Sequence, residues 1–204
     1  MHLVDEEHLA GLQTGQYRGD VAGGVDHVDL FQIHRPDVFT HPEEVASGLT
    51  QLKQRGLIRA GGVSNYTPSQ IHALHKYLGT DLITVQPEFS VAHLDPLRDG
   101  TLDLCQQERL TPLAWSPLAG GRIATGENVR PDLIVTLDRL AATYSVSREA
   151  IAIAFVLAHP SKPIALVGTQ QPQRLIDCAT AVSVPLTRQD VYDIIQASDG
   201  SPLP

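Results

Sequence analysis

Cysteine is scarce in this sequence of 204 residues, which contains only Cys105 and Cys178 and no CxxC pair. Disulfide frameworks and thiolate metal sites both need several closely spaced cysteines, so neither is indicated. We therefore expect two buried, reduced thiols.

Long apolar runs are also missing. The longest, residues 150–158, has nine residues and is too short to cross roughly 30 Å of hydrocarbon. The first ten residues, MHLVDEEHLA, are acidic where a signal peptide needs a basic start and an apolar stretch. These features predict a soluble cytoplasmic protein with no membrane partner.

Positive charge is in deficit, with 15 Lys and Arg against 23 Asp and Glu and a net charge of -8. This balance argues against binding to nucleic acid or to anionic membranes, although local basic sites for small anions remain open. A hydrophobic fraction of 42% with 19% charged residues is typical of a globular chain and excludes disorder throughout.

What the sequence does contain is an alternation of short β-rich runs with amphipathic segments, which predicts a parallel α/β fold. Residues 26–204 form one predicted domain, and residues 1–25 are left without a predicted element. The expected strands are 28–33, 60–63, 82–85, 113–116 and 163–167. The expected helices are 42–56, 68–77, 102–108, 131–144, 148–158 and 172–181.

Polar residues lie at the end of each predicted strand or just after it. In parallel α/β folds the carboxyl ends of the strands share one face, where ligands bind, so these residues form a candidate site. They are His34, Ser64, Asn65, Gln86, Trp115, Ser116 and Thr169.

Five segments in this order resemble the strand-end motifs of the aldo-keto reductases: VDLFQIHRPD, GLIRAGGVSNYTPSQI, VQPEFS, LAWSPLAGGRI and PIALVGTQQPQRL. The resemblance covers about residues 26–204. It implies a partial (β/α)8 TIM barrel containing about the last five βα units. It further implies an NADPH-dependent oxidoreductase that acts on a small carbonyl compound, an aldehyde or ketone.

His34 matches the family histidine that hydrogen-bonds the substrate carbonyl, so the resemblance makes it the catalytic residue of this chain. A neutral imidazole N–H can stabilise the negative charge that develops on oxygen. Taken without the surrounding motif, a histidine after a strand is more often structural.

Ser64, Asn65 and Gln86 match family residues that bind the nicotinamide carboxamide, a group that needs both donors and acceptors. The alternative for these residues is capping of the helix that follows. Trp115 matches the aromatic ring that stacks on the nicotinamide, with a core tryptophan as the alternative.

Two further segments resemble phosphate-binding parts of the family. Ser116, Pro117 and Leu118, followed by AGGR, match the loop near the cofactor pyrophosphate, where small residues let backbone N–H groups approach. Gly168, Thr169, Arg174 and Asp177 match the site of the adenosine 2′-phosphate and adenine. Gly168 stands where some members have Lys, so NADPH is expected with less discrimination against NADH.

No metal site is predicted. His72 and His75 have metal-compatible spacing, but no partner ligand stands near them in the sequence and a solvated helix face is the expected reading. No Walker loop, GxSxG elbow or Rossmann glycine fingerprint occurs.

The resemblance also implies an Asp, a Tyr and a Lys from three preceding βα units, which have no match here. Tyr17 lacks the family context of the catalytic tyrosine, and none of Lys53, Lys76 and Lys162 follows a strand in the required place. The chain therefore resembles the C-terminal two-thirds of a reductase, as a frameshift, a misplaced start codon or a gene remnant would produce.

Two readings stay open for a chain without these groups. One is an impaired reductase, and the other is a non-catalytic NADP(H)-binding or interaction protein, or a non-functional fragment. Oligomeric state is not indicated by the sequence.

Overall fold

The computed structural model describes residues 2–4, 26–78 and 82–202 of the chain. The chain divides into two compact units. Unit 1 comprises Met1–Pro87 and Asp99–Thr111, and unit 2 comprises Glu88–Arg98 and Pro112–Pro204.

Unit 1 contains a parallel sheet in the order β1 (His2–Val4), β2 (Val28–Ile33), β3 (Ile58–Ser64) and β4 (Leu82–Gln86). The three predicted strands of this unit are confirmed, and β3 is longer than expected. β1 lies in the segment that carries no predicted element. Ile33 pairs with Val63, and Ser64 pairs with Gln86, so β2, β3 and β4 end level with one another.

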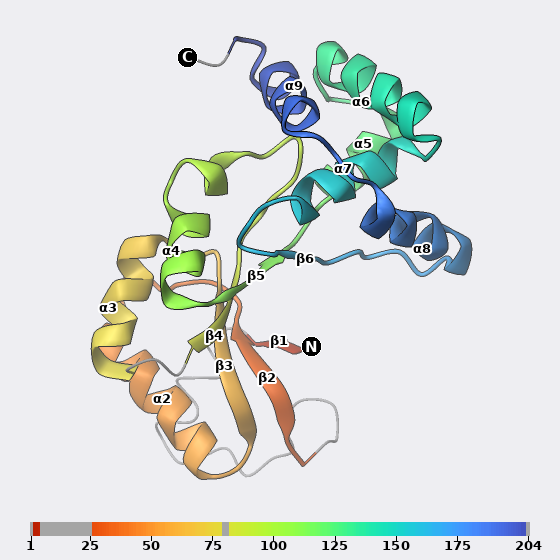
Figure 1. Cartoon of the computed structure of the whole chain (residues 1–204). Helices are drawn as coiled ribbons and strands as arrows, with labels where there is room; N and C mark the ends of the chain where they lie inside the picture. The colour runs from red at the N-terminus through yellow and green to blue at the C-terminus, as the bar shows by residue number, and fades with distance from the viewer. Residues whose placement is uncertain (1, 5–25, 79–81, 203–204) are drawn as a thin grey trace. The chain divides into compact units, whose positions relative to one another are not determined.

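Three helices cover one face of this sheet: α2 (Pro42–Gln54), α3 (Pro68–Leu78) and α4 (Thr101–Glu108). Figure 1 shows α2 and α3 side by side along the strands. Alternate strand residues, among them Ile33, Val63 and Val85, are fully buried in the core against these helices. Because side chains alternate along a strand, the intervening residues face the other side of the sheet.

Local sequence signals explain where the helices of unit 1 begin. His41 precedes α2 and its Nδ1 accepts a hydrogen bond from the amide of Glu43 at 3.3 Å. A capping box begins α3, since Gln70 N donates to Thr67 Oγ1 at 3.3 Å and Thr67 N donates to Gln70 Oε1 at 2.9 Å.

Unit 2 contains the parallel strands β5 (Thr111–Ala114) and β6 (Ile164–Ala165). Both differ from their predicted bounds. Ser116 adopts a left-handed φ of 54°, so residues 115–116 fall outside the strand predicted at 113–116. β6 is limited to two residues of the predicted 163–167, since Pro163 has no N–H to donate and the chain is irregular from residue 166.

The helices of unit 2 build a second core. The helices predicted near 131–144, 148–158 and 172–181 are confirmed within two residues. The sequence did not predict the short α5, nor α9 with its Thr187–Asp190 capping box. The elements are η1 (Asp95–Leu97), η2 (Ala119–Gly121), α5 (Arg122–Thr125), α6 (Pro131–Tyr144), α7 (Arg148–Leu157), α8 (Pro172–Ala179), η3 (Thr180–Ser183) and α9 (Arg188–Asp199).

Arg148 links three helices of unit 2. Its guanidinium forms a two-pronged ion pair with Asp138 of α6, at 2.6 and 2.8 Å. Its third nitrogen donates to the carbonyls of Ile123 and Ala124 in α5, at 3.1 and 3.4 Å. Because α5 has only four residues, it depends on such external bonds.

Both cysteines are free and buried, as the sequence predicts. Cys105 lies in the core of unit 1, and burial raises the pKa of its thiol to about 12. Cys178 lies in a core cluster of unit 2, and burial is the main cause that raises its pKa.

Within the described ranges, no single helix combines the length and apolarity needed to cross a membrane. The pair α6 and α7 reaches that threshold only when taken together, and it is bent by 93°.

Candidate functional site

His34 follows the last residue of β2 and is half-buried. Its main-chain carbonyl accepts a hydrogen bond from Asn65 Nδ2 at 3.3 Å. The loop after it is ordered by Asp37, whose carboxylate accepts from Phe39 N and from Thr40 Oγ1, both at 2.8 Å. The bond from the Phe39 amide is the main cause that lowers the pKa of Asp37.

Ser64 and Asn65 bind the end of the next strand. Ser64 Oγ donates to the carbonyl of Gln86 at 2.9 Å, and Asn65 N donates to the same oxygen at 3.1 Å. Asn65 Nδ2 also donates to Ser64 Oγ at 3.1 Å. These bonds link the ends of two strands, and Thr67 caps the helix.

Gln86 supplies an acceptor at this edge of the sheet. Its side chain is buried, with 4% of its surface exposed, and within the described part of the chain its Oε1 has no hydrogen-bond partner. A buried carbonyl oxygen without a partner costs free energy, so it favours a ligand that brings an N–H group. Unit 1 therefore gathers His34, Ser64, Asn65 and Gln86 at one end of its strands, as predicted; their roles toward a ligand stay predictions.

In unit 2, Trp115 is half-buried and follows β5. Its carbonyl accepts from Phe89 N at 3.3 Å. The turn after it closes through a hydrogen bond from Ala119 N to the carbonyl of Ser116 at 2.8 Å. Pro117 is buried and Leu118 half-buried within this turn, so residues 116–118 form an ordered loop, as a backbone anion site requires.

Gly168 and Thr169 precede α8. Thr169 Oγ1 accepts from Gln171 N at 3.2 Å, which orders the chain just before the helix begins. Arg174 is exposed on the first turns of α8. Asp177 is exposed too, and its carboxylate accepts from Gln173 Nε2 at 3.0 Å, so the predicted adenine contact already has a partner on its own helix.

The histidine pair on α3 differs partly from expectation. His72 is exposed, whereas His75 is half-buried with its Nε2 shielded from solvent. Burial is the main cause that lowers the pKa of His75. Across the described ranges, no three His, Cys, Asp or Glu side chains gather in a way that could hold a metal ion.

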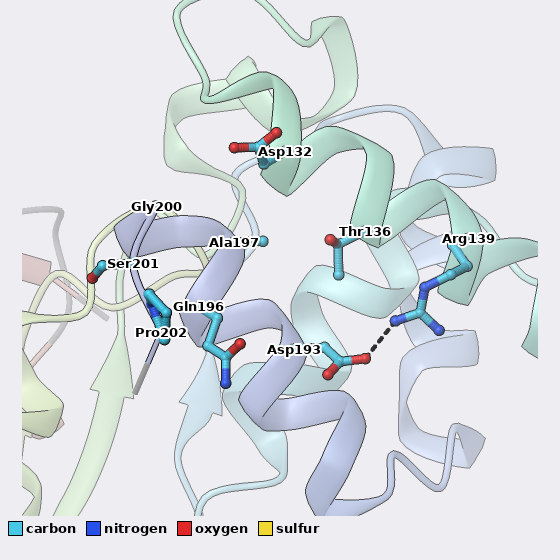
Figure 2. A pocket seen from close by; sticks show the side chains of 9 residues that line it. All are labelled: Asp132, Thr136, Arg139, Asp193, Gln196, Ala197, Gly200, Ser201 and Pro202. Carbon is cyan, nitrogen blue, oxygen red and sulfur yellow. Dashed lines mark hydrogen bonds and ion pairs between the residues drawn. The ribbon is translucent and has the colours of Figure 1, made fainter. Parts of the chain in front are cut away.

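Unit 2 also carries a cavity of about 410 Å³ between α6 and α9 (Figure 2). Arg139 and Asp193 form an ion pair across it at 2.6 Å. None of the predicted site residues lines this cavity, so it is separate from the candidate site. Its lining is Asp132, Thr136, Arg139, Asp193, Gln196, Ala197, Gly200, Ser201 and Pro202.

Sequence reasoning missed three residues one step deeper along the strands than the candidate site. Gln32 and Thr84 are buried polar residues, and Gly62 lies between them in the sheet. The available signal was strand periodicity, since each lies two residues before His34, Gln86 and Ser64 respectively and so shares their face.

Comparison with known proteins identifies the family. The sequence model of the aldo/keto reductase family matches residues 23–199. The chain is 43% identical over 181 residues to a 6-dehydroglucose reductase of Novosphingobium aromaticivorans. The match covers 88% of this chain and 60% of that protein. It is 39% identical over 206 residues to oxidoreductase YdhF of Escherichia coli. That match covers 100% of this chain and 67% of that protein. The chain thus spans about 60 to 67% of the length of these relatives.

The fold has solved counterparts. An aldo/keto reductase from Klebsiella pneumoniae, crystallised with NADP and acetate, matches with a TM-score of 0.81 and 22% identity. The match covers 99% of this chain and 69% of that one. The predicted partial (β/α)8 barrel is therefore confirmed as the fold class.

Proposed function

The chain belongs to the aldo/keto reductase family, and we propose that it carries the carbonyl-orienting and cofactor-binding parts of an NADPH-dependent reductase of aldehydes or ketones. The observation that carries the proposal is the cluster at the carboxyl ends of β2, β3 and β4. There Asn65 joins His34 to Ser64, and Ser64 joins Gln86.

The cluster fits a nicotinamide carboxamide. The buried Gln86 Oε1, without a partner among the described residues, would accept from the carboxamide N–H₂. The Ser64 hydroxyl donates its proton to a main-chain carbonyl, so toward a ligand this oxygen can act only as an acceptor. When bound, the reduced cofactor supplies a hydride to the carbonyl carbon.

His34 would orient the substrate carbonyl. Its half-buried ring follows a strand whose end is held by Asn65, so the imidazole is carried on an ordered element. A neutral N–H directed at the carbonyl oxygen stabilises the charge that develops there.

Unit 2 by itself offers groups of the kinds that bind a dinucleotide cofactor. Trp115 offers a flat surface for stacking, and the loop 116–118 offers backbone donors. Arg174, with Gly168 and Thr169, offers a charged contact to a 2′-phosphate, which favours NADPH over NADH. A cytoplasmic location and a small carbonyl substrate complete the proposal.

We expect this chain alone to be an impaired catalyst. Reduction leaves an alkoxide that needs a proton, and the tyrosine and lysine of the family's preceding units have no counterpart among the matched motifs. The loss of a positioned general acid costs roughly 10² to 10⁴ in rate.

NADPH binding and NADPH consumption with a generic aldehyde, measured side by side, test the proposal. Binding with turnover at least roughly 10²-fold below that of a complete relative is expected. Fusion of the first three βα units of a relative ahead of Val28 should restore turnover, and His34→Ala should lower it again while NADPH affinity stays nearly unchanged. His72→Ala, an exposed histidine on α3, is the control.

Absence of NADPH binding by the folded chain would contradict the cofactor assignment. Binding by an inactive fusion, or a fusion indifferent to His34→Ala, would favour the non-catalytic nucleotide-binding reading.

A further inference from the structure

A row of polar residues crosses the sheet of unit 1 beneath the candidate site. Gln32 of β2 pairs with Gly62 of β3, and Gly62 pairs with Thr84 of β4. The next row toward the strand ends contains Ser64 and Gln86, which pair with each other. The deeper row therefore shares a face with the site and lies two residues below it along each strand.

The deeper row is sealed from solvent yet rich in hydrogen-bonding atoms. Gln32 is 0% exposed and Thr84 is 5% exposed. Three side-chain atoms of this row have no hydrogen-bond partner among the described residues: Gln32 Nε2, Gln32 Oε1 and Thr84 Oγ1. A buried amide or hydroxyl without a partner destabilises the fold, so three such atoms in one row point to a bound polar guest.

Gly62 explains how the two side chains come together. A Cβ on this residue would lie 2.0 Å from Thr84 Oγ1 and 2.1 Å from Gln32 Oε1. Both polar atoms therefore occupy the space over the glycine backbone, close to one another. Only glycine leaves room for both side chains there.

We propose that Gln32 and Thr84, meeting over Gly62, bind an internal water molecule directly beneath the carboxamide-binding row. Water is the guest that fits, because it both donates and accepts hydrogen bonds. It can therefore satisfy an amide carbonyl, an amide N–H₂ and a hydroxyl together. A charged guest is disfavoured, since the row itself contains no charged side chain to neutralise it.

The bound water also gives Gln32 and Thr84 a positioning role. It ties β2 to β4 across the glycine, one step before the strand ends that carry His34 and Gln86. This second role rests on the proposed function, whereas the water site does not.

Magnetic relaxation dispersion of ¹⁷O and ²H, which counts long-lived internal waters, tests the site on the full chain. The double variant Gln32→Met with Thr84→Val keeps the approximate side-chain shapes and removes the polar atoms. We expect it to lose about one long-lived water. Thr84→Ser keeps the hydroxyl and should keep the water, and Gln54→Met, on the exposed surface of α2, is the matched control.

An unchanged water count in the folded double variant would overturn the proposal. If that variant does not fold, the single variant Thr84→Val is used. It should have fewer long-lived waters than Thr84→Ser, and equal numbers would overturn the proposal. The proposal would also be overturned if Thr84→Val raised the melting temperature without losing a water. The gain in stability would then come only from removing a hydroxyl that has no partner.

NADPH affinity reports the positioning role separately. We expect the double variant to bind NADPH roughly three- to tenfold more weakly, with Thr84→Ser close to wild type. Unchanged affinity would remove the positioning role. A wild-type chain that retains its water but binds no NADPH would contradict the proposed function and leave the water site standing.

Discussion

The side chain of Asn65 donates a hydrogen bond from Nδ2 to the main-chain oxygen of His34, 31 residues earlier in the sequence, at 3.3 Å. Asn65 holds this position with a left-handed φ of 59°. Asparagine tolerates this conformation better than other residues with a Cβ. One residue thus combines an uncommon backbone conformation with the bond that fixes the end of β2.

Two substitutions separate these contributions. Asn65→Gly removes the side-chain bond but keeps the backbone unstrained, whereas Asn65→Ala removes the bond and adds strain. We expect both to lower the free energy of unfolding, with Ala lower than Gly by about 1 kcal/mol. Urea unfolding measures the difference, and equal stabilities would show that the left-handed conformation is not retained.

Adjacent glycines in β3 offer a second matched pair. A Cβ on Gly62 would overlap Gln32 and Thr84, whereas a Cβ on Gly61 would meet Leu49 at an ordinary 3.6 Å. Gly62→Ala should therefore lower the free energy of unfolding by about 1 to 3 kcal/mol. Gly61→Ala should change it far less, and similar losses in both would contradict the close packing over Gly62.

Trp115 is the sole tryptophan of the chain, so its fluorescence is a specific probe of the proposed cofactor site. Stacking against a nicotinamide should quench its emission as NADPH is added. Calorimetry should give the same Kd as the quenching curve. Unchanged emission at saturating NADPH, with binding seen by calorimetry, would remove Trp115 from the site.

Arg174 tests the choice between cofactors. Arg174→Ala should weaken NADPH binding more than NADH binding by roughly 1 to 3 kcal/mol, because a charge-assisted contact to the 2′-phosphate is lost. Arg188→Ala, an exposed arginine at the start of α9, controls for net charge. Equal weakening of both cofactors would assign Arg174 to the fold.

The Asp138–Arg148 pair predicts a pH dependence of stability. The bond from Arg148 is the main cause that lowers the pKa of Asp138 below its ordinary value of 3.8. A carboxyl whose pKa is lower in the folded state stabilises the fold above its unfolded pKa. That contribution is lost as the pH falls through the folded pKa. Asp138→Asn should therefore flatten the decline in stability as the pH falls below about 5.

Charge-matched substitution completes that experiment. Asp103→Asn, on the exposed side of α4, removes one carboxyl without touching Arg148. In this variant the stability should decline with falling pH nearly as steeply as in the wild type. If both variants flatten the curve equally, general charge repulsion explains the effect instead of the ion pair.

Sequence patterns located most elements because local signals agreed with burial. α6 runs from Pro131 to Tyr144, as predicted, since a proline begins it and Leu133, Leu137 and Leu140 form one buried stripe. α9 went unpredicted although its start carries a capping box, because that box uses Asp190 in place of the usual Glu or Gln.

The candidate site was predictable in part. Strand ends with polar residues gave His34, Ser64, Asn65 and Gln86, because parallel strands end at a common edge. The row of Gln32, Gly62 and Thr84 was not predicted, since burial of a glutamine inside an apolar strand follows only from the pairing of three strands distant in sequence. The left-handed Ser116 likewise shortened β5, which propensity alone does not reveal.

Each unit contains one buried thiol, Cys105 in unit 1 and Cys178 in unit 2. A thiol with a raised pKa and little accessible surface reacts with an alkylating reagent chiefly when its surroundings open. The alkylation rate of each thiol therefore reports how often its own unit opens. Mass spectrometry of peptides after timed alkylation would give one opening rate for each unit. The two rates would show which unit opens first.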